Sequence, residues 1–450
     1  MPNLKLTKIT NQLGINKQLH FYLYAVYSVL IFILITFFFP RALAGNFNGL
    51  LFIADVNVLL CVISILTSFL CLYAVKKRYL NVTHTSSLII LLLIFLYFVP
   101  GLYINAAVNV SINYYFAYIV FFFMILLADM LLPYPKKKFQ FLNRISGKNV
   151  RLLFLCLVVA VTILMLCLNK NYDVINGLIS AIRNTYEVRA KAAGKIHWLF
   201  LGMEYWAAYY SIIMITFYLS KKRWFIVFLL MLIVLCFFTI QANRVMLFFL
   251  GIALIAGMMK KIDNRHIAGG LLIVSLLIFI EVLIAPDNGK IATSFFTRFS
   301  VIPNRLGENY YDYFLKNEPD YFRLHFPRLM KLMGLSSPYS NPSIGNLIGR
   351  EFYSRTMNAN TGLFGSAMLN FGVIGSLVEP ILVVLLLRLI DKVTIGVGTY
   401  SMKLMISIVM TTLLINLPSA LISAIMPVSY LCWLLMSLVL ASRSDDVTSY

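Results

Sequence analysis

Long apolar stretches recur along the whole chain, and they constrain its fold more than any other feature. Most reach about 18 residues or more, enough to cross a hydrocarbon core of roughly 30 Å at about 1.5 Å per residue. Hydrophobic residues make up 61% of the chain and charged residues only 12%, which is far from the composition of soluble proteins. The sequence therefore predicts an all-α fold, a polytopic helical bundle in a membrane.

Hydropathy and flanking charge together predict about 12 transmembrane helices with both chain ends in the cytoplasm, because Lys and Arg in short loops are retained there. The last two spans are the least regular: a single helix kinked at Pro418 also fits, and it would place the C-terminus outside. The predicted spans cover residues 21–39, 56–75, 86–105, 114–132, 152–169, 197–219, 224–240, 245–259, 267–285, 370–390, 404–417 and 420–441.

This topology divides the chain into three parts. Residues 1–285 hold spans one to nine and a shorter outer loop at 170–196, residues 286–361 form one large outer loop, and residues 362–450 hold spans ten to twelve and a cytoplasmic tail. The large loop is too aromatic for a disordered linker, so short amphipathic helices lying at the membrane interface are expected within it. Apolar residues recur there at helical spacing, at Phe322, Phe326, Leu329 and Leu332.

The net charge of +21 lies mostly in short loops between spans, which favours a topological role over nucleic-acid binding. On the predicted outer side, however, arginines outnumber lysines, and the topology rule does not explain this. A planar guanidinium binds phosphate oxygens through two parallel hydrogen bonds, which an ammonium group cannot do. The bias predicts a phosphate-bearing ligand at the outer face.

Three candidate phosphate-binding arginines lie before the large loop. Arg183 and Arg189 lie in the loop at 170–196, where ten residues separate Arg183 from Gly194; a basic flap over an anionic headgroup and a solvated amphipathic helix both fit. Arg244 ends a tight polar turn before the short span 245–259. An arginine drawn below the headgroups normally has a partner or a ligand, although snorkelling to the interface is the alternative.

The large loop interleaves basic and acidic residues. Arg298 and Arg305 are candidates for binding phosphate, although local ion pairs also account for such a pattern. The candidate general bases, which the sequence does not rank, are Glu308, Asp312, Glu351 and His325. Walker, zincin and G-x-S-x-G motifs are missing from the sequence, so neither a metal nor a nucleotide cofactor is expected.

Three blocks of sequence resemble the Wzy-type O-antigen polymerases, inner-membrane proteins of Gram-negative bacteria. The first is the hairpin IQANRVMLFFLGIAL at 240–254, and the second is TRFSVIPNRLGENYYDYF at 297–314, which opens the large loop. The third is SIGNLIGREFYSRTMNANTGLFGSAMLNFGVIGSLVEP at 343–380. The spacing from Arg183 to Gly194 is also similar to a motif of these enzymes. The resemblance covers roughly residues 180–390.

The resemblance implies a metal-independent glycosyltransferase that polymerises oligosaccharide repeat units linked to undecaprenyl pyrophosphate at the periplasmic face. It implies pyrophosphate binding by Arg244 and Arg298, with Arg183, Arg189 and Arg305 in support, and a separate membrane partner that regulates chain length. Two rival functions remain open. An O-antigen ligase would transfer the finished glycan to lipid A-core and would use a loop histidine such as His325, and a flippase would move the lipid-linked oligosaccharide across the bilayer.

Overall fold

The structure is a computed structural model of the chain in which the molecule divides into two compact units. The first unit comprises Met1–Pro133, Asp263–Leu387 and Leu414–Ser423, and the second comprises Tyr134–Ile262, Arg388–Leu413 and Ala424–Tyr450. The structure describes residues 19–38, 55–78, 84–135, 147–168, 198–241, 244–259, 264–284, 300–324, 327–339, 344–353, 359, 362–395, 400–416, 420–421 and 434.

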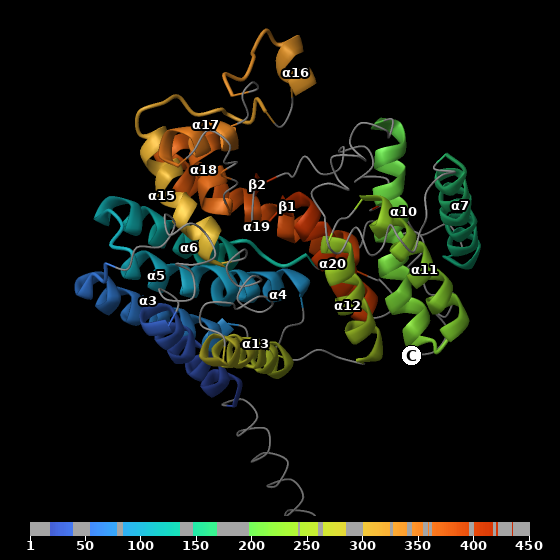
Figure 1. Cartoon of the computed structure of the whole chain (residues 1–450), viewed down its shortest axis with the longest axis horizontal. Helices are drawn as coiled ribbons and strands as arrows, with labels where there is room; N and C mark the ends of the chain where they lie inside the picture. Colours follow the sequence, from blue (N-terminus) through green and yellow to red (C-terminus); the bar gives the residue numbers. More distant parts are fainter. Residues whose placement is uncertain are drawn as a thin grey trace, which may run out of the picture. The chain divides into compact units, whose positions relative to one another are not determined.

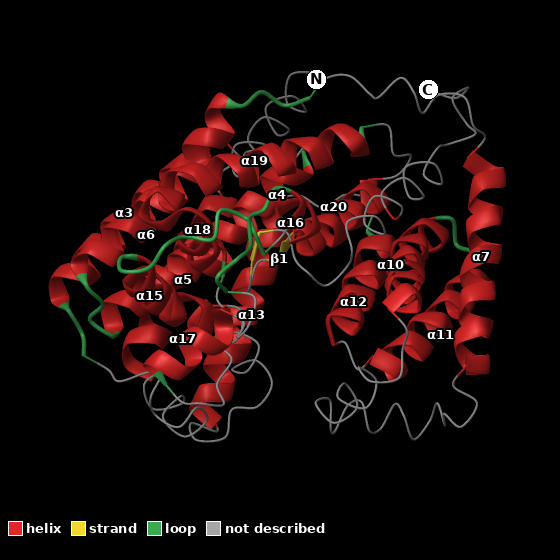
Figure 2. Ribbon diagram, turned by 90° about the horizontal axis from the view of Figure 1, so that it is seen from above, coloured by secondary structure: helices red, strands yellow, loops and turns green. Residues whose placement is uncertain are grey.

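Nearly all of the described residues are helical, and the one strand pair, β1 (Ile415–Asn416) with β2 (Ala420–Leu421), is very short (Figure 2). The helices of the first unit are η1 (Leu34–Phe38), α3 (Val58–Arg78), α4 (Thr85–Leu92), η2 (Leu93–Phe98), α5 (Val99–Ala107), α6 (Ile112–Leu131), α13 (Asn264–Ile284), α15 (Ile302–Phe314), α16 (Pro327–Leu332), α17 (Ile344–Phe352), α18 (Leu363–Phe371), η5 (Gly372–Ile374) and the first part of α19 (Gly375–Thr394). Those of the second unit are α7 (Gly147–Leu168), α10 (Trp198–Ser220), α11 (Trp224–Gln241), α12 (Arg244–Met258) and nearly all of α20 (Tyr400–Leu414).

Seven helical segments within the described ranges are long and apolar enough to cross a membrane, so the chain is a multi-pass helical membrane protein. They are Leu19–Phe37, Val58–Lys76, Ser86–Ala107, Ile112–Leu131, Asn149–Cys167, Arg265–Ile284 and Leu363–Thr394. The predicted spans six, seven and eight coincide with α10, α11 and α12, and most of span eleven coincides with α20. The prediction was wrong at the end of span eleven and the start of span twelve, because residues 415–416 and 420–421 pair as strands there. Apart from residues 420–421 and 434, span twelve lies outside the described residues, and the total of twelve spans and their sidedness stay predictions.

In the second unit, α10 packs against α7, α11 and α12. Its contact face is aromatic: the ring of Trp206 stacks on that of Tyr210 at 5.5 Å, and Phe154 of α7 meets both. The opposite faces of the neighbouring helices are apolar and exposed, as at Ile163 and Phe228. Such a surface suits lipid tails, because the backbone polar groups in the interior of a regular helix are satisfied within the helix.

In the first unit, the span Ser86–Ala107 is interrupted and lies at the centre. Its middle part, η2, is a π-helix, and Pro100 follows in the first turn of α5. Pro100 has no N–H. The backbone N–H of the preceding Val99 donates to Ile94 O, five residues earlier, so the same π-helical spacing leaves Phe95 O without a donor from Pro100. The hydroxyl of Tyr27 donates to Phe95 O, and that of Ser300 donates to the neighbouring Leu96 O. The interruption therefore binds other elements to this span.

A second interruption divides the apolar segment Leu363–Thr394. The helix α18 ends where Gly372 takes a φ of 62°, and α19 begins three residues later. Helix ends leave carbonyls without partners, and here the backbone N–H groups of Asp320 and Tyr321 donate to the oxygens of Leu369 and Asn370 at 2.6 and 3.0 Å. The segment that begins after α15 thus caps this broken helix.

The large loop contains the expected short helices, α15, α16 and α17, but two details differ from the prediction. First, α15 packs against α5, α17 and α18 of the first unit (Figure 1), and Tyr310, Tyr311 and Phe314 are buried. Second, the helical spacing through Phe322 does not produce a helix there. Tyr321 and Phe322 lie in a turn with φ of 51° and 61°, and the helix α16 begins only at Pro327.

Candidate functional site

The first turn of α15 is fastened to the interrupted span Ser86–Ala107. Next to Ser300, which donates to Leu96 O, the side-chain amide of Asn304 donates to Tyr97 O at 3.3 Å and to Ser300 O at 2.6 Å. The hydroxyl of Tyr118 also donates to Tyr97 O at 3.2 Å. The contacts of Ser300 with Leu96 and of Asn304 with Tyr97 join residues that lie 204 and 207 positions apart in the chain. They fix where α15 begins and how it is turned.

The sequence of α15 defines the ends of the helix and its buried face. Pro303 lies in the first turn, where its missing N–H costs nothing. At the other end, the amide of Asn317 donates to Tyr313 O at 2.8 Å and closes the last turn. The apolar face holds Leu306, Tyr310 and Phe314 at helical spacing, all buried. The remaining face is polar.

That polar face carries three of the predicted site residues, Arg305, Glu308 and Asp312. They follow one another at three and four positions, so they lie along one side of the helix. We call this set, with Asn309 at its margin, the α15 polar face. It is the only place among the described residues where predicted phosphate-binding and predicted catalytic candidates occur on one helix.

Arg305 and Glu308 form an ion pair that is largely shielded from solvent. Arg305 Nη1 lies 2.5 Å from Glu308 Oε2, and the two side chains are 24% and 15% exposed. The other oxygen, Glu308 Oε1, accepts from the backbone N–H of Ser111 at 2.9 Å, just before α6. A carboxylate is stabilised at a helix N-terminus. Both oxygens of the Glu308 carboxylate therefore have a partner. Arg305 Nε, by contrast, is buried without a hydrogen-bond partner among the described residues.

Asp312 differs from Glu308 in its environment. Its pKa is raised, first because burial disfavours the charged carboxylate and second because the negative charge of Glu308 lies nearby; Lys316 and Arg305 act in the opposite direction. A carboxylate with a raised pKa is a stronger proton acceptor once it is ionised. Of the acids on the α15 polar face, Asp312 therefore suits proton transfer best.

The margin of the polar face is closed by the segment that follows α17. The side-chain amide of Asn309 donates to the hydroxyl of Tyr353 at 2.7 Å, and the hydroxyl of Tyr310 donates to Ala359 O at 2.8 Å. Glu351, the third described acid among the candidates, is exposed on α17. Its charge raises the pKa of Tyr313 on α15, after the larger effect of burial. Glu351 thus belongs to the surroundings of α15.

The other predicted site residues are not brought to this face by the structure. Arg244 begins α12 in the second unit, and its side chain is outside the description. Arg183, Arg189, Arg298 and His325 lie outside the described residues. Their predicted roles stay predictions.

Sequence reasoning missed Ser111, Asn304, Asn309 and Tyr353. A serine directly before the apolar span Ile112–Leu131 is a recognisable N-cap, and its hydroxyl accepts from Tyr114 N at 3.4 Å. The other three carry no comparable signal, because their partners are distant in the chain. The glutamate Glu379, which the sequence marks as polar within a span, is buried in α19 and accepts from the amide of Asn370 at 3.0 Å.

Comparison with known proteins adds no identification. No protein-family model, curated protein or solved structure matches this chain. The function therefore has to be argued from the residues of the site.

Proposed function

We propose that this chain is a metal-independent glycosyltransferase of the inner membrane that polymerises oligosaccharide repeat units linked to undecaprenyl pyrophosphate. The growing chain on one lipid carrier would be the donor, and the repeat unit on a second carrier would be the acceptor. A separate membrane protein would regulate chain length. The observation that carries the proposal is the α15 polar face, where a shielded guanidinium lies on the same side of one helix as an acid with a raised pKa.

Arg305 supplies the anion-binding part of the proposal. In the structure its charge is balanced by Glu308, and its buried Nε makes no hydrogen bond to a described residue. A diphosphate carries several acceptor oxygens and more negative charge than one carboxylate, so it competes well for a forked donor. Because the pair is partly buried, the interaction is stronger than it would be in water.

Asp312 supplies the proton-accepting part. In the proposed step, Asp312 takes the proton from the acceptor hydroxyl, and the hydroxyl oxygen forms a bond to the anomeric carbon of the donor. The bond from that carbon to the diphosphate oxygen breaks, and its electron pair leaves with undecaprenyl pyrophosphate. Arg305 stabilises the charge that develops on the leaving oxygen. Glu308 positions Arg305 and caps α6, so it is a positioning residue here.

The proposal is tested with purified protein in lipid nanodiscs and a synthetic undecaprenyl-pyrophosphate repeat unit. Elongation is read as a ladder of products on a gel. We expect Arg305→Lys to reduce the rate about 10²–10³-fold, because an ammonium cannot reproduce the forked contact. We expect Asp312→Asn to reduce it about 10²–10⁴-fold, as for the loss of a general base. The matched control is Arg350→Lys, an exposed arginine on α17, which should retain the ladder.

Three results would contradict the proposal. A ladder unchanged in Arg305→Lys and Asp312→Asn would remove the α15 polar face from the reaction. Transfer of a preformed glycan to lipid A-core without elongation would identify a ligase. Redistribution of the lipid-linked unit between the two leaflets, again without elongation, would identify a flippase.

A further inference from the structure

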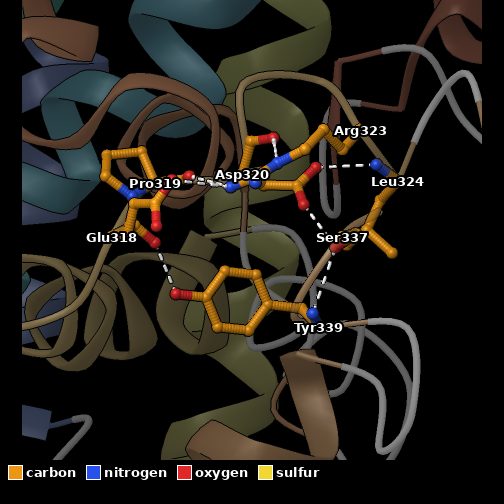
Figure 3. Close-up of polar contacts among 7 residues, drawn as sticks. All are labelled: Glu318, Pro319, Asp320, Arg323, Leu324, Ser337 and Tyr339. Atoms are coloured by element: carbon orange, nitrogen blue, oxygen red, sulfur yellow. Dashed lines mark hydrogen bonds and ion pairs between the residues drawn. The ribbon is translucent and has the colours of Figure 1, made fainter. Parts of the chain in front are cut away.

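One buried carboxylate ties together the two ends of a projecting segment. Asp320 is fully buried; its Oδ2 accepts from Leu324 N at 2.7 Å, and its Oδ1 accepts from the hydroxyl of Ser337 (Figure 3). The chain leaves this point after Leu324 and has returned to it at Ser337. We call residues 327–337 the arm.

Further contacts make the base of the arm rigid. Arg323 donates to Asp320 O and Pro319 O at 2.8 and 2.9 Å and to Glu318 Oε1 at 3.1 Å. The hydroxyl of Tyr339 donates to Glu318 O, and Tyr339 N donates to the hydroxyl of Ser337 at 3.1 Å. Since the N–H groups of Asp320 and Tyr321 also cap α18, the base is fastened to the transmembrane part of the first unit.

The tip of the arm is also held by backbone hydrogen bonds. The helix α16 ends in a Schellman motif, in which Leu335 N donates to Met330 O at 2.8 Å and Gly334 N donates to Lys331 O at 3.2 Å. Gly334 takes the positive φ of 72° that this motif requires. The tip is therefore a fixed turn and not a flexible strand of chain.

The fixed tip nevertheless exposes large apolar side chains. Leu332 is 86% exposed, Met333 62% and Leu335 46%, and Figure 1 shows α16 standing clear of α15, α17 and α18. Exposing three neighbouring apolar side chains to water is unfavourable. Their exposure on a turn held by hydrogen bonds therefore indicates that a partner covers them.

We propose that the arm tip, Lys331–Leu335, inserts into the headgroup region of an anionic lipid bilayer. From Leu324 to Tyr339 the sequence carries Arg328 and Lys331 and no acidic residue. Apolar side chains next to basic ones are the composition of segments that lie in a membrane interface. A turn of this size is too small for a stable protein interface, which buries roughly 1,200 Å² or more in total. The bilayer is already the environment of the spans to which the base is fastened. This proposal does not depend on the proposed enzymatic activity.

The test places an environment-sensitive fluorophore on the tip. All six natural cysteines are replaced, Leu332→Cys is labelled with a nitrobenzoxadiazole dye, and the full chain is reconstituted in nanodiscs with anionic or zwitterionic lipid. We expect a blue-shifted emission that is quenched by lipids carrying a nitroxide near the headgroup, most strongly with anionic lipid. The control Asn317→Cys, exposed before the ion-paired base, should keep a water-like emission.

A charge variant sharpens the same experiment. Lys331→Gln removes one positive charge next to the probe, and we expect the ratio of inserted to free tip to fall about fivefold with anionic lipid and to stay unchanged with zwitterionic lipid. A water-like emission at residue 332 in both lipids would overturn the proposal. A blue shift without nitroxide quenching would also overturn it, since the tip would then pack against protein, either this chain or a second copy.

Discussion

Two spans of the first unit are similar in length and apolarity but differ in almost everything else. Ser86–Ala107 has 22 residues and Arg265–Ile284 has 20, yet 89% of the first is buried inside the protein and only 33% of the second. The regular helix exposes Ile273, Leu277 and Ile284, as expected of a lipid-facing surface. Hydropathy places both helices in the membrane, but it does not decide which one lies in the centre.

The two helices differ in which groups donate hydrogen bonds to their backbone carbonyls. In Arg265–Ile284, the hydroxyl of Ser275 donates to Leu272 O of its own helix at 2.8 Å, so this hydrogen bond stays within the helix. In Ser86–Ala107, which holds π-helical turns and Pro100, carbonyl oxygens accept hydrogen bonds from Tyr27, Ser300 and Asn304 of other elements. Unsatisfied backbone groups are costly in hydrocarbon. The interrupted helix is therefore held at the centre, and it holds α15 there as well.

The largest expected effect contrasts a glycine of each span. A Cβ at Gly101 would lie 2.0 Å from the hydroxyl of Tyr118 and 2.4 Å from Asn304 Oδ1, and both side chains are buried. We expect Gly101→Ala to lower the free energy of unfolding by about 3 kcal/mol, because a close-packed core cannot yield without strain. Nothing lies within 4 Å of a Cβ at Gly270, so Gly270→Ala should be neutral or slightly stabilising. Unfolding in sodium dodecyl sulfate, followed by circular dichroism, measures both; equal stability of the two variants would remove the contrast.

A smaller effect is expected for a serine of each region. Ser300→Ala removes the hydroxyl that contacts Leu96 O, and the free energy of unfolding should fall by about 2 kcal/mol because a buried carbonyl loses its partner. Ser275→Ala leaves Leu272 O with its own helical neighbours, so its cost should be about 0.5 kcal/mol or less. The same denaturation assay compares them. If Ser275→Ala proved the more costly change, the account of the interrupted span would be wrong.

How much of this was predictable depends on the distance between partners. The apolar spans and the charged α15 residues Arg305, Glu308 and Asp312 follow from local pattern, and the sequence predicts short helices in the large loop. The burial of α15 does not follow, because the hydroxyl of Ser300, just before α15, donates to Leu96 O in a distant part of the chain. A proline predicts where a helix is interrupted, but it does not predict which groups of other elements bind there.

The same limit explains the turn after α15. The apolar spacing through Phe322 predicts a helix, but the carboxylate of Asp320 bonds Leu324 N and Ser337 and holds a turn instead. Aspartate favours turns and caps through such side-chain to backbone bonds. The ion pair at this turn joins Arg323 to Glu318.

The smallest expected effect concerns the pH dependence of the proposed reaction. Asp312 must be ionised to accept a proton, so activity falls on the acidic side as pH drops through its pKa. Glu308 raises that pKa through its negative charge. Glu308→Gln removes this charge and releases Arg305, and both changes favour the carboxylate form of Asp312. The acidic limb of kcat/KM should therefore move to lower pH.

The pH at which this acidic limb falls distinguishes two roles for Glu308: a residue that positions Arg305, and the general base itself. A measurement of rate at a single pH would not distinguish them. If Glu308 only positions Arg305, the variant loses some rate while its acidic limb moves down. If Glu308 is itself the base, activity disappears and no limb remains to be measured. The control is Glu351→Gln, an acid that is exposed on α17 and does not contribute to the shifted pKa of Asp312. Its profile should match that of the unaltered protein, because water screens an exposed charge far more than a shielded one.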